Sequence, residues 1–169
     1  FIAHRLYGDS LFDMALNDRG YRIGLGRQHI QMNDMPLENI ISNNALTFQK
    51  ETSIKEVSLK MIENKVTEAV IINNRNEYIG KITIYDILNT KIKNNNEIKS
   101  LLKNNHLVLN NNISLLKSIE EASNFVGEFI PVKNFKNDKY VGSINEADLF
   151  QAYLDLQNQV IFEEKDTNK

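Results

Sequence analysis

The chain has 169 residues, a formal net charge of −2 and no cysteine. The missing cysteine excludes a disulfide scaffold, a thiolate metal site and a cysteine nucleophile. The near-neutral charge argues against a broad nucleic-acid-binding face, and a hydrophobic content of 41% indicates a globular protein.

No apolar stretch approaches the roughly 18 residues that a membrane span needs, and no signal peptide is visible. We therefore expect the chain itself to be soluble. Because it begins with Phe1 rather than with methionine, we also expect it to be a piece of a longer polypeptide.

The first 36 residues are expected to form a linker. A short helix is predicted over residues 10–19, because Ser10 can cap its start, its apolar residues share one face, and Gly20 follows it. The arginines of this linker could contact phospholipid headgroups or pair with carboxylates of the linker itself.

A repeat fills most of the remaining chain. Residues 37–48 match residues 98–109 in their apolar positions and in an Asn-Asn pair, at an offset of 61 residues. Asp86 matches Asp148 at an offset of 62, so the second copy contains one inserted residue. We expect two copies that need each other rather than a solenoid, because two repeats are too few for a solenoid.

The repeat divides the chain into four predicted segments. The linker at 1–36 is followed by a first copy at 37–91 and a second copy at 92–158. The final segment, 159–169, is expected to be a polar tail with a frayed end.

Both copies predict the element order β-α-β-β-α. In the first copy we expect a strand over 46–48, a helix capped by Ser53, strands over 69–72 and 78–84, and a helix that starts near Thr83. In the second copy we expect a strand over 107–109, a helix after Asn112, strands over 129–132 and 140–144, and a helix that starts near Asn145. The two strands that a polar turn joins in each copy predict an antiparallel hairpin. Pro131 indicates an edge position or a strand start.

With these elements, each copy resembles a CBS motif, and the tandem resembles a Bateman module. The signature residues are Phe-Ile-Pro-Val at 129–132 and the pattern Gly-x-x-Thr-x-x-Asp at Gly80, Thr83 and Asp86. The resemblance implies an α+β fold in which two motifs, related by pseudo-two-fold symmetry, pack through three-stranded sheets behind a helical linker. Two clefts result, which bind adenosine nucleotides in many members and are empty and structural in others.

The resemblance also implies candidate nucleotide contacts. Gly80 would let a ligand approach the backbone, and Thr83 would offer its hydroxyl and a helix N-terminus to a phosphate. Asp86 would accept hydrogen bonds from ribose hydroxyls. The corresponding residues of the second copy are Gly142, Asn145 and Asp148. The ligand would be ATP, ADP or AMP, and no cofactor is required.

These assignments have alternatives in the sequence. Thr83 and Asp86 also form a helix-capping pattern, which needs no ligand. The second copy has Asn145 where the family has threonine or serine, and Glu146 adds a negative charge that would repel phosphate. In the first copy, Ala69 stands where the family usually has proline.

The segment before the repeat resembles the linker of ClC-type chloride channels and chloride/proton exchangers. The resemblance rests on residues 7–16 (YGDSLFDMAL) and on Arg-Gly and Gly-Arg pairs up to Arg27. In that family the linker joins the last membrane helix to cytoplasmic CBS domains.

The first hypothesis is therefore a non-enzymatic regulatory and assembly domain of a bacterial inner-membrane chloride-transport protein, cytoplasmic and dimeric with its parent. The alternatives are the regulatory module of a soluble enzyme, or a structural dimerisation element with empty clefts. No catalytic residue, metal site or nucleic-acid partner is predicted, and His4, His29 and His106 have no metal-ligand spacing.

Overall fold

The computed structural model describes residues 27–89, 98–102 and 106–167. The helix predicted over 10–19 lies outside the described residues, as does most of the segment that resembles the chloride-channel linker. The chain separates into two compact units. One unit holds the described parts of 1–40, 113–126 and 146–169, and the other holds those of 41–112 and 127–145.

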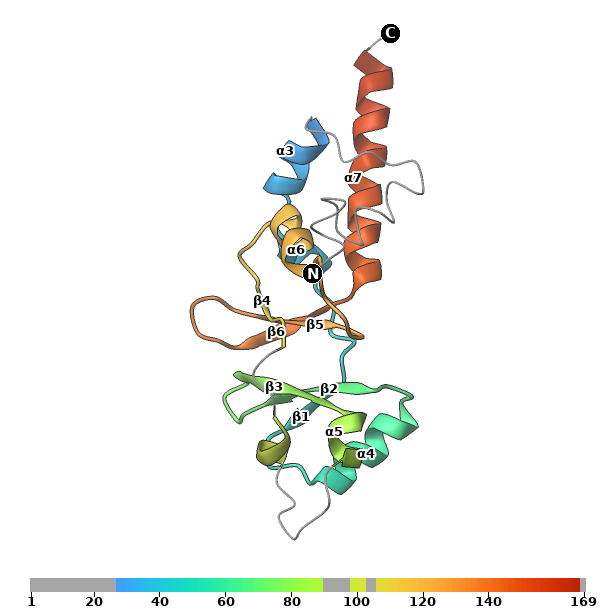
Figure 1. The fold of residues 1–169 in the computed structure, drawn as a ribbon. Helices are drawn as coiled ribbons and strands as arrows, with labels where there is room; N and C mark the ends of the chain where they lie inside the picture. The colour runs from blue at the N-terminus through green and yellow to red at the C-terminus, as the bar shows by residue number, and fades with distance from the viewer. Residues whose placement is uncertain (1–26, 90–97, 103–105, 168–169) are drawn as a thin grey trace, which may run out of the picture. The chain divides into compact units, whose positions relative to one another are not determined.

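The first copy forms the elements that its sequence predicts. They are β1 (Thr47–Gln49), α4 (Ile54–Glu63), β2 (Glu68–Ile72), β3 (Tyr78–Thr83) and α5 (Ile84–Asn89). β1 pairs in parallel with β2, and β2 pairs antiparallel with β3, which confirms the predicted hairpin. Ser53 caps α4 by accepting a hydrogen bond from the Glu56 N–H at 3.2 Å. Both helices lie on one face of this sheet (Figure 1).

The second copy repeats this pattern with a shorter first strand. Its elements are β4 (Leu109–Asn110), α6 (Leu115–Ala122), β5 (Ile130–Lys133), β6 (Tyr140–Ile144) and α7 (Glu146–Thr167). Its sheet has the order β4-β5-β6, matching β1-β2-β3. The predicted α+β class with two β-α-β-β-α copies is therefore confirmed.

Three local features differ from the sequence-based expectation. α7 continues to Thr167, well past the predicted end at 158, because no glycine or proline interrupts it. An additional helix, α3 (Arg27–Asp34), was not predicted, since glycines precede it closely in the sequence. Pro131 lies in the central strand β5, so the edge alternative was wrong, but it is the second residue of that strand, close to the strand start that was the other alternative. It is tolerated near the strand start, because β4 pairs with Val132 and Lys133 beyond it.

The residues before the first strand of each copy, called its leading segment below, contact the other copy. In the second copy, this segment includes the 3-10 helix η2 (Ile98–Leu101), and Ile98 is fully buried in the core formed by β1–β3, α4 and α5. In the first copy, Ser42 exchanges two backbone hydrogen bonds, 2.9 and 2.8 Å long, with Ser143 of β6. Each copy is therefore completed by residues from its neighbour.

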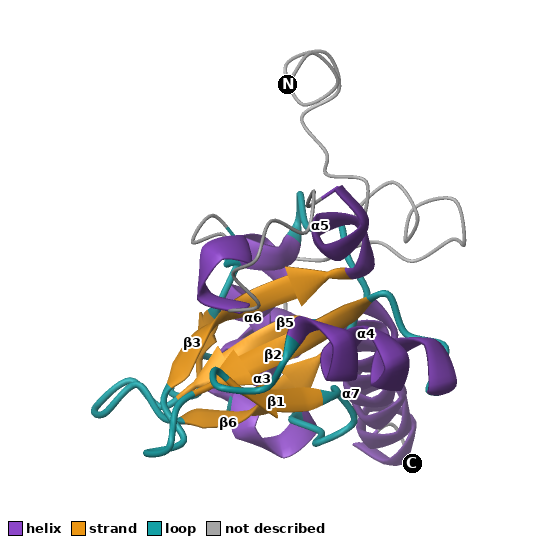
Figure 2. Cartoon of the chain, turned by 90° about the horizontal axis from the view of Figure 1, so that it is seen from below, coloured by secondary structure: helices purple, strands orange, loops and turns teal. Residues whose placement is uncertain are grey.

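The two sheets face each other within one compact unit, as the predicted packing requires. Val70, Ile72 and Phe129 form a buried cluster between them, joined by Tyr78 and Tyr140. The hairpin turns also pair: the Tyr78 N–H donates to the Asp138 carbonyl at 3.0 Å, and the Tyr140 N–H donates to the Asn76 carbonyl at 2.8 Å. Figure 2 views the strands from the side on which α4 and α5 lie.

The other compact unit is helical. It contains α3, the 3-10 helix η1 (Leu37–Ile40), α6 and α7, and these helices contact one another. Leu37 and Tyr153 are fully buried in this unit. None of the helices in the described residues is both long and apolar enough to cross a bilayer.

Candidate functional site

Gly80 lies in β3, opposite Ile71 of β2 and next to a bulge in their pairing. A Cβ at this position would lie 3.2 Å from Cδ2 of Leu102, which belongs to the leading segment of the second copy. The close approach that glycine permits here is therefore made by a side chain of the protein itself. A ligand contact at Gly80 stays a prediction.

Thr83 and Asp86 form a reciprocal cap at the start of α5. The Thr83 hydroxyl and N–H both donate to Oδ2 of Asp86, at 2.7 and 3.2 Å. The Asp86 N–H donates back to Oγ1 of Thr83 at 3.1 Å. The capping alternative from the sequence is thus present in the structure. A carboxylate can accept about four hydrogen bonds, so these two do not exhaust Asp86.

A buried ion pair lies beside this cap, and sequence analysis did not find it. Lys81, which is 2% exposed, places Nζ 2.9 Å from Oε2 of Glu68, which is 9% exposed. Nζ also lies 5.5 Å from the ring centroid of Phe129, the residue just before β5 of the facing sheet. Glu68 pairs in register with Thr83, so the ion pair is directly next to the cap. A lysine directly after Gly80, within an otherwise apolar buried strand, was the available signal.

The same place holds a direct connection between the two copies. Oε1 of Glu128 accepts hydrogen bonds from the Thr67 N–H at 2.9 Å and from the Thr67 hydroxyl at 2.7 Å. The Glu128 N–H donates to Oε2 of Glu68 at 2.9 Å. The starts of β2 and β5 are therefore joined by charge-assisted hydrogen bonds.

Two tyrosines line the interface between the facing sheets. Burial, together with the neighbouring Tyr140 and Glu68, raises the pKa of Tyr78 well above its usual value. Burial also raises the pKa of Tyr140. Both phenols therefore stay neutral at physiological pH and can act as hydrogen-bonding groups.

The second-copy candidates divide between the two compact units. Gly142 is buried in β6 with φ +156°, and a Cβ there would lie 2.5 Å from Cγ2 of Ile41. Asn145 follows β6 in the same compact unit, whereas Asp148 lies in the first turn of α7, in the helical unit. Gly80, Thr83 and Asp86 thus all belong to one compact unit, whereas Gly142 and Asn145 belong to that unit and Asp148 to the other.

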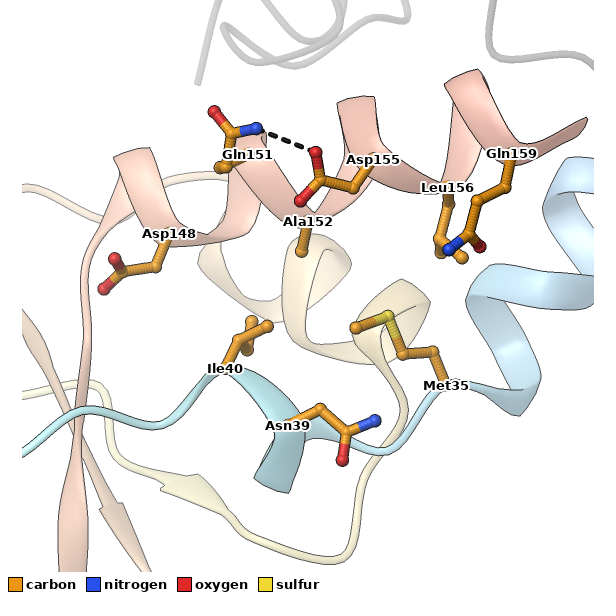
Figure 3. Close-up of a pocket in the computed structure, with 9 residues that line it drawn as sticks. All are labelled: Met35, Asn39, Ile40, Asp148, Gln151, Ala152, Asp155, Leu156 and Gln159. Carbon is orange, nitrogen blue, oxygen red and sulfur yellow. Dashed lines mark hydrogen bonds between the residues drawn. The ribbon is translucent and has the colours of Figure 1, made fainter. Parts of the chain in front are cut away.

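Asp148 instead lines an open cavity of about 550 Å³ in the helical unit. α7 forms one wall with Asp148, Gln151 and Asp155, and the opposite wall includes Met35 and Ile40 (Figure 3). The Gln151 side-chain amide donates to Asp155 at 2.8 Å. Among the described residues, no group of three or more histidine, cysteine, aspartate or glutamate side chains could hold a metal ion.

Comparison with known families matches the first copy of the repeat. The model described as "CBS domain" matches residues 37–93. A homoserine O-acetyltransferase from Methanosphaera stadtmanae is 27% identical over 117 residues, which is 69% of this chain and 24% of that protein. The chain thus spans about a quarter of the length of this curated relative.

Solved structures with the same fold include three ligand complexes. CbpB in complex with c-di-AMP has a TM-score of 0.69 and 16% identity, covering 81% of this chain and 96% of that one. CBSX2, a CBS-pair protein from Arabidopsis thaliana, was solved in complex with AMP; its TM-score is 0.61, with 16% identity over 73% of this chain and 98% of that one. A third CBS domain pair was solved with 5′-methylthioadenosine and S-adenosyl-L-methionine (TM-score 0.55, 18% identity, 70% and 95% coverage).

The two three-stranded sheets agree with the fold of these structures. Residues 37–93 match the CBS domain, and the chain has the fold of a CBS domain pair.

Proposed function

We propose that this chain is a regulatory module that binds an adenosine-containing ligand beside Thr83 and Asp86. The observation that supports the proposal is the fold, which is shared with CBS pairs solved with AMP, c-di-AMP and S-adenosyl-L-methionine. Thr83, the last residue of β3, pairs with Glu68 next to the contacts that join the two copies, and Asp86 follows it in α5. A ligand there would touch both copies.

Asp86 has the chemistry that a ribose requires. Its carboxylate is held in place by the two hydrogen bonds from Thr83, so little side-chain entropy is lost when a ligand binds. Hydrogen bonds from ribose hydroxyls to an ionised carboxylate are about twice as strong as neutral ones.

The proposed module regulates rather than catalyses. A bound ligand changes the activity of a partner domain only if it binds two conformations of the module with different affinities. The contacts between Glu128 and Thr67 are suited to such a difference, because they join the two copies directly.

Isothermal titration calorimetry with adenosine ligands tests this proposal. We expect binding, and a stabilisation of about 2.7 kcal/mol when the ligand is at 100 times its Kd. Asp86→Asn keeps an oxygen acceptor for Thr83 but removes the charge, and we expect about tenfold weaker binding. Asp155→Asn, the same change on the exposed face of α7, is the matched control. Absence of binding by every adenosine compound at roughly millimolar concentration would overturn the proposal.

Two parent proteins are candidates for the partner domain. A chloride channel or chloride/proton exchanger is supported by the resemblance of residues 7–27, and the module would then lie on the cytoplasmic face of a bacterial inner membrane. A soluble enzyme is supported by the match to an acetyltransferase. The gene sequence upstream of Phe1 discriminates them, because the first requires hydrophobic spans and the second requires a catalytic domain.

We also propose that the module forms a homodimer through α4 and α5. These two helices contact each other and expose Leu59, Ile62, Tyr85 and Leu88, which are 51–74% accessible. Such a cluster on adjacent elements is typical of an interaction surface. α4 also carries exposed lysines and glutamates in equal number, Lys55, Lys60, Glu56 and Glu63, so a two-fold axis could pair opposite charges.

Light scattering after size exclusion tests the dimer. Ile62→Glu is expected to give monomers, whereas Val126→Glu, at an apolar position that is 92% exposed outside α4 and α5, is expected to leave the mass unchanged. A monomeric wild-type chain, or a dimer that Ile62→Glu leaves intact, contradicts this interface.

A further inference from the structure

The helical unit contains an open cavity of about 550 Å³. Small-molecule sites commonly measure about 300–1,000 Å³, so the cavity is large enough for one. Its walls come from α7 and from the chain between the end of α3 and the end of η1, all within that unit. The adenosine site proposed beside Thr83 and Asp86 belongs to the other compact unit. The cavity is therefore a second, separate candidate for a ligand site.

The cavity combines an apolar surface with an acidic one. Ala152 of α7 and, on the opposite wall, Met35 and Ile40 supply apolar groups (Figure 3). The polar groups are carboxylates and carboxamides, which belong to Asp148, Asp155, Asn39, Gln151 and Gln159. Among the described residues that line the cavity, none is basic. A complementary ligand therefore carries positive charge on an aliphatic body.

The two carboxylates lie on the same face of α7. Asp148 and Asp155 are seven residues apart, so an α-helix places them about 20° from each other around its axis and about 10.5 Å apart along it. Ala152 lies between them on this wall (Figure 3). Asp155 accepts a hydrogen bond from Gln151 at 2.8 Å, and a carboxylate can accept about four. The wall therefore presents negative charge at both ends of an apolar stretch.

We propose that the cavity binds a linear aliphatic diamine or polyamine, whose ammonium groups pair with Asp148 and Asp155. A hydrogen bond from an ammonium group to a carboxylate is about 2.8 Å long. Nitrogens about 5–10 Å apart can therefore bridge carboxylates that are about 10.5 Å apart. Fully extended, the five bonds between the nitrogens of putrescine span about 6 Å, and the nine bonds between the terminal nitrogens of spermidine span about 10 Å. Both compounds fall in this range.

Both parts of such a ligand contribute to binding. An ion pair with an exposed carboxylate such as that of Asp155 contributes little by itself, because water screens the charges. Two ammonium groups on one chain bind as a unit, since the first holds the second at a high effective concentration. The methylene groups between them lie against Ala152 and Ile40 and are removed from water. A Mg²⁺ ion has neither advantage, because it cannot reach both carboxylates and has no apolar part.

Isothermal titration calorimetry on the intact chain, with putrescine, spermidine and n-butylamine, tests the inference. Butylamine has the methylene chain of putrescine and one ammonium group fewer. We expect putrescine and spermidine to bind at least about tenfold more tightly than butylamine, and equimolar Mg²⁺ not to displace them. Equal affinities for putrescine and butylamine, displacement by Mg²⁺, or no binding of putrescine or spermidine at roughly millimolar concentration overturns the inference.

A charge variant locates the site. Asp155→Asn removes one carboxylate from the wall, so the preference for putrescine over butylamine should fall from about tenfold to about onefold. The matched control is Asp138→Asn, the same change at an exposed aspartate of the other compact unit, which should leave the preference unchanged. Circular dichroism confirms that both variants are folded. A preference that Asp155→Asn does not alter, or that Asp138→Asn lowers equally, refutes the site. Adenosine binding is proposed for the other unit, so either proposal can fail while the other holds.

Discussion

The two equivalent glycines of the repeat are expected to respond very differently to the same substitution. Gly142 has φ +156°, and its Cβ would lie 2.5 Å from Ile41 Cγ2 and 2.6 Å from the Ser42 carbonyl oxygen. A backbone oxygen cannot rotate away, so Gly142→Ala must shift the leading segment of the first copy. Overpacking and the unfavourable φ each cost on the order of 1–3 kcal/mol.

Gly80→Ala is the matched comparison. Its Cβ would meet only the side chain of Leu102, with Cδ2 at 3.2 Å, and a flexible side-chain end can move by a few tenths of an ångström. The alanine also restricts the unfolded chain, which stabilises the protein by about 0.4–1 kcal/mol and offsets part of the crowding. We therefore expect a net change of less than about 1 kcal/mol for this variant.

Urea unfolding followed by circular dichroism measures both variants, with the midpoint and slope fitted separately. We expect Gly142→Ala to lose about 2–6 kcal/mol, which at about 2–4 °C per kcal/mol also lowers Tm by at least several degrees. Adding Ile41→Ala to Gly142→Ala should recover only part of the loss, because the contact with the Ser42 carbonyl remains. Equal losses for Gly80→Ala and Gly142→Ala would refute the reasoning that backbone proximity decides the cost.

Three further predictions concern the cores and caps. Lys81→Met leaves the Glu68 carboxylate buried without its ion pair and should cost about 3–5 kcal/mol in urea unfolding, whereas Lys133→Met, which breaks a more exposed pair, should cost less than about 1 kcal/mol. Ser114→Ala removes the N-cap of α6 and should cost about 1 kcal/mol, measured in the same way. The pKa of Tyr78 is raised in the folded state, so the unfolded chain loses this proton first as the pH rises. The free energy of unfolding is therefore retained below about pH 10. Above that pH it falls by up to about 1.4 kcal/mol per pH unit. Urea unfolding at increasing alkaline pH should show a smaller loss of stability for Tyr78→Phe than for the wild-type chain. The same dependence of stability on pH in both proteins would contradict the raised pKa of Tyr78.

Local patterns were sufficient to predict most of the elements. Ser53 is followed by apolar residues at helical spacing, so the capping residue and the apolar pattern both predict the same helix, α4. The polar turns between apolar strands predicted both hairpins for the same reason. The candidate site was predicted only in part: the sequence placed Thr83 and Asp86 at a helix start, but their mutual hydrogen bonds follow from side-chain orientation, which a pattern of residue types does not contain.

The sequence by itself determined the two copies, their β-α-β-β-α order and the class of fold, because these depend on periodicity and turn residues within a few positions. Only the tertiary structure decided that each leading segment packs on the other copy, as Ile98 and Ser42 do. It also decided that Glu128 reaches Thr67 and that Lys81 is buried against Glu68. These contacts join residues far apart in the chain or on neighbouring strands. The free energy that selects them comes from burial and charge pairing in the folded state, which no short stretch of sequence carries.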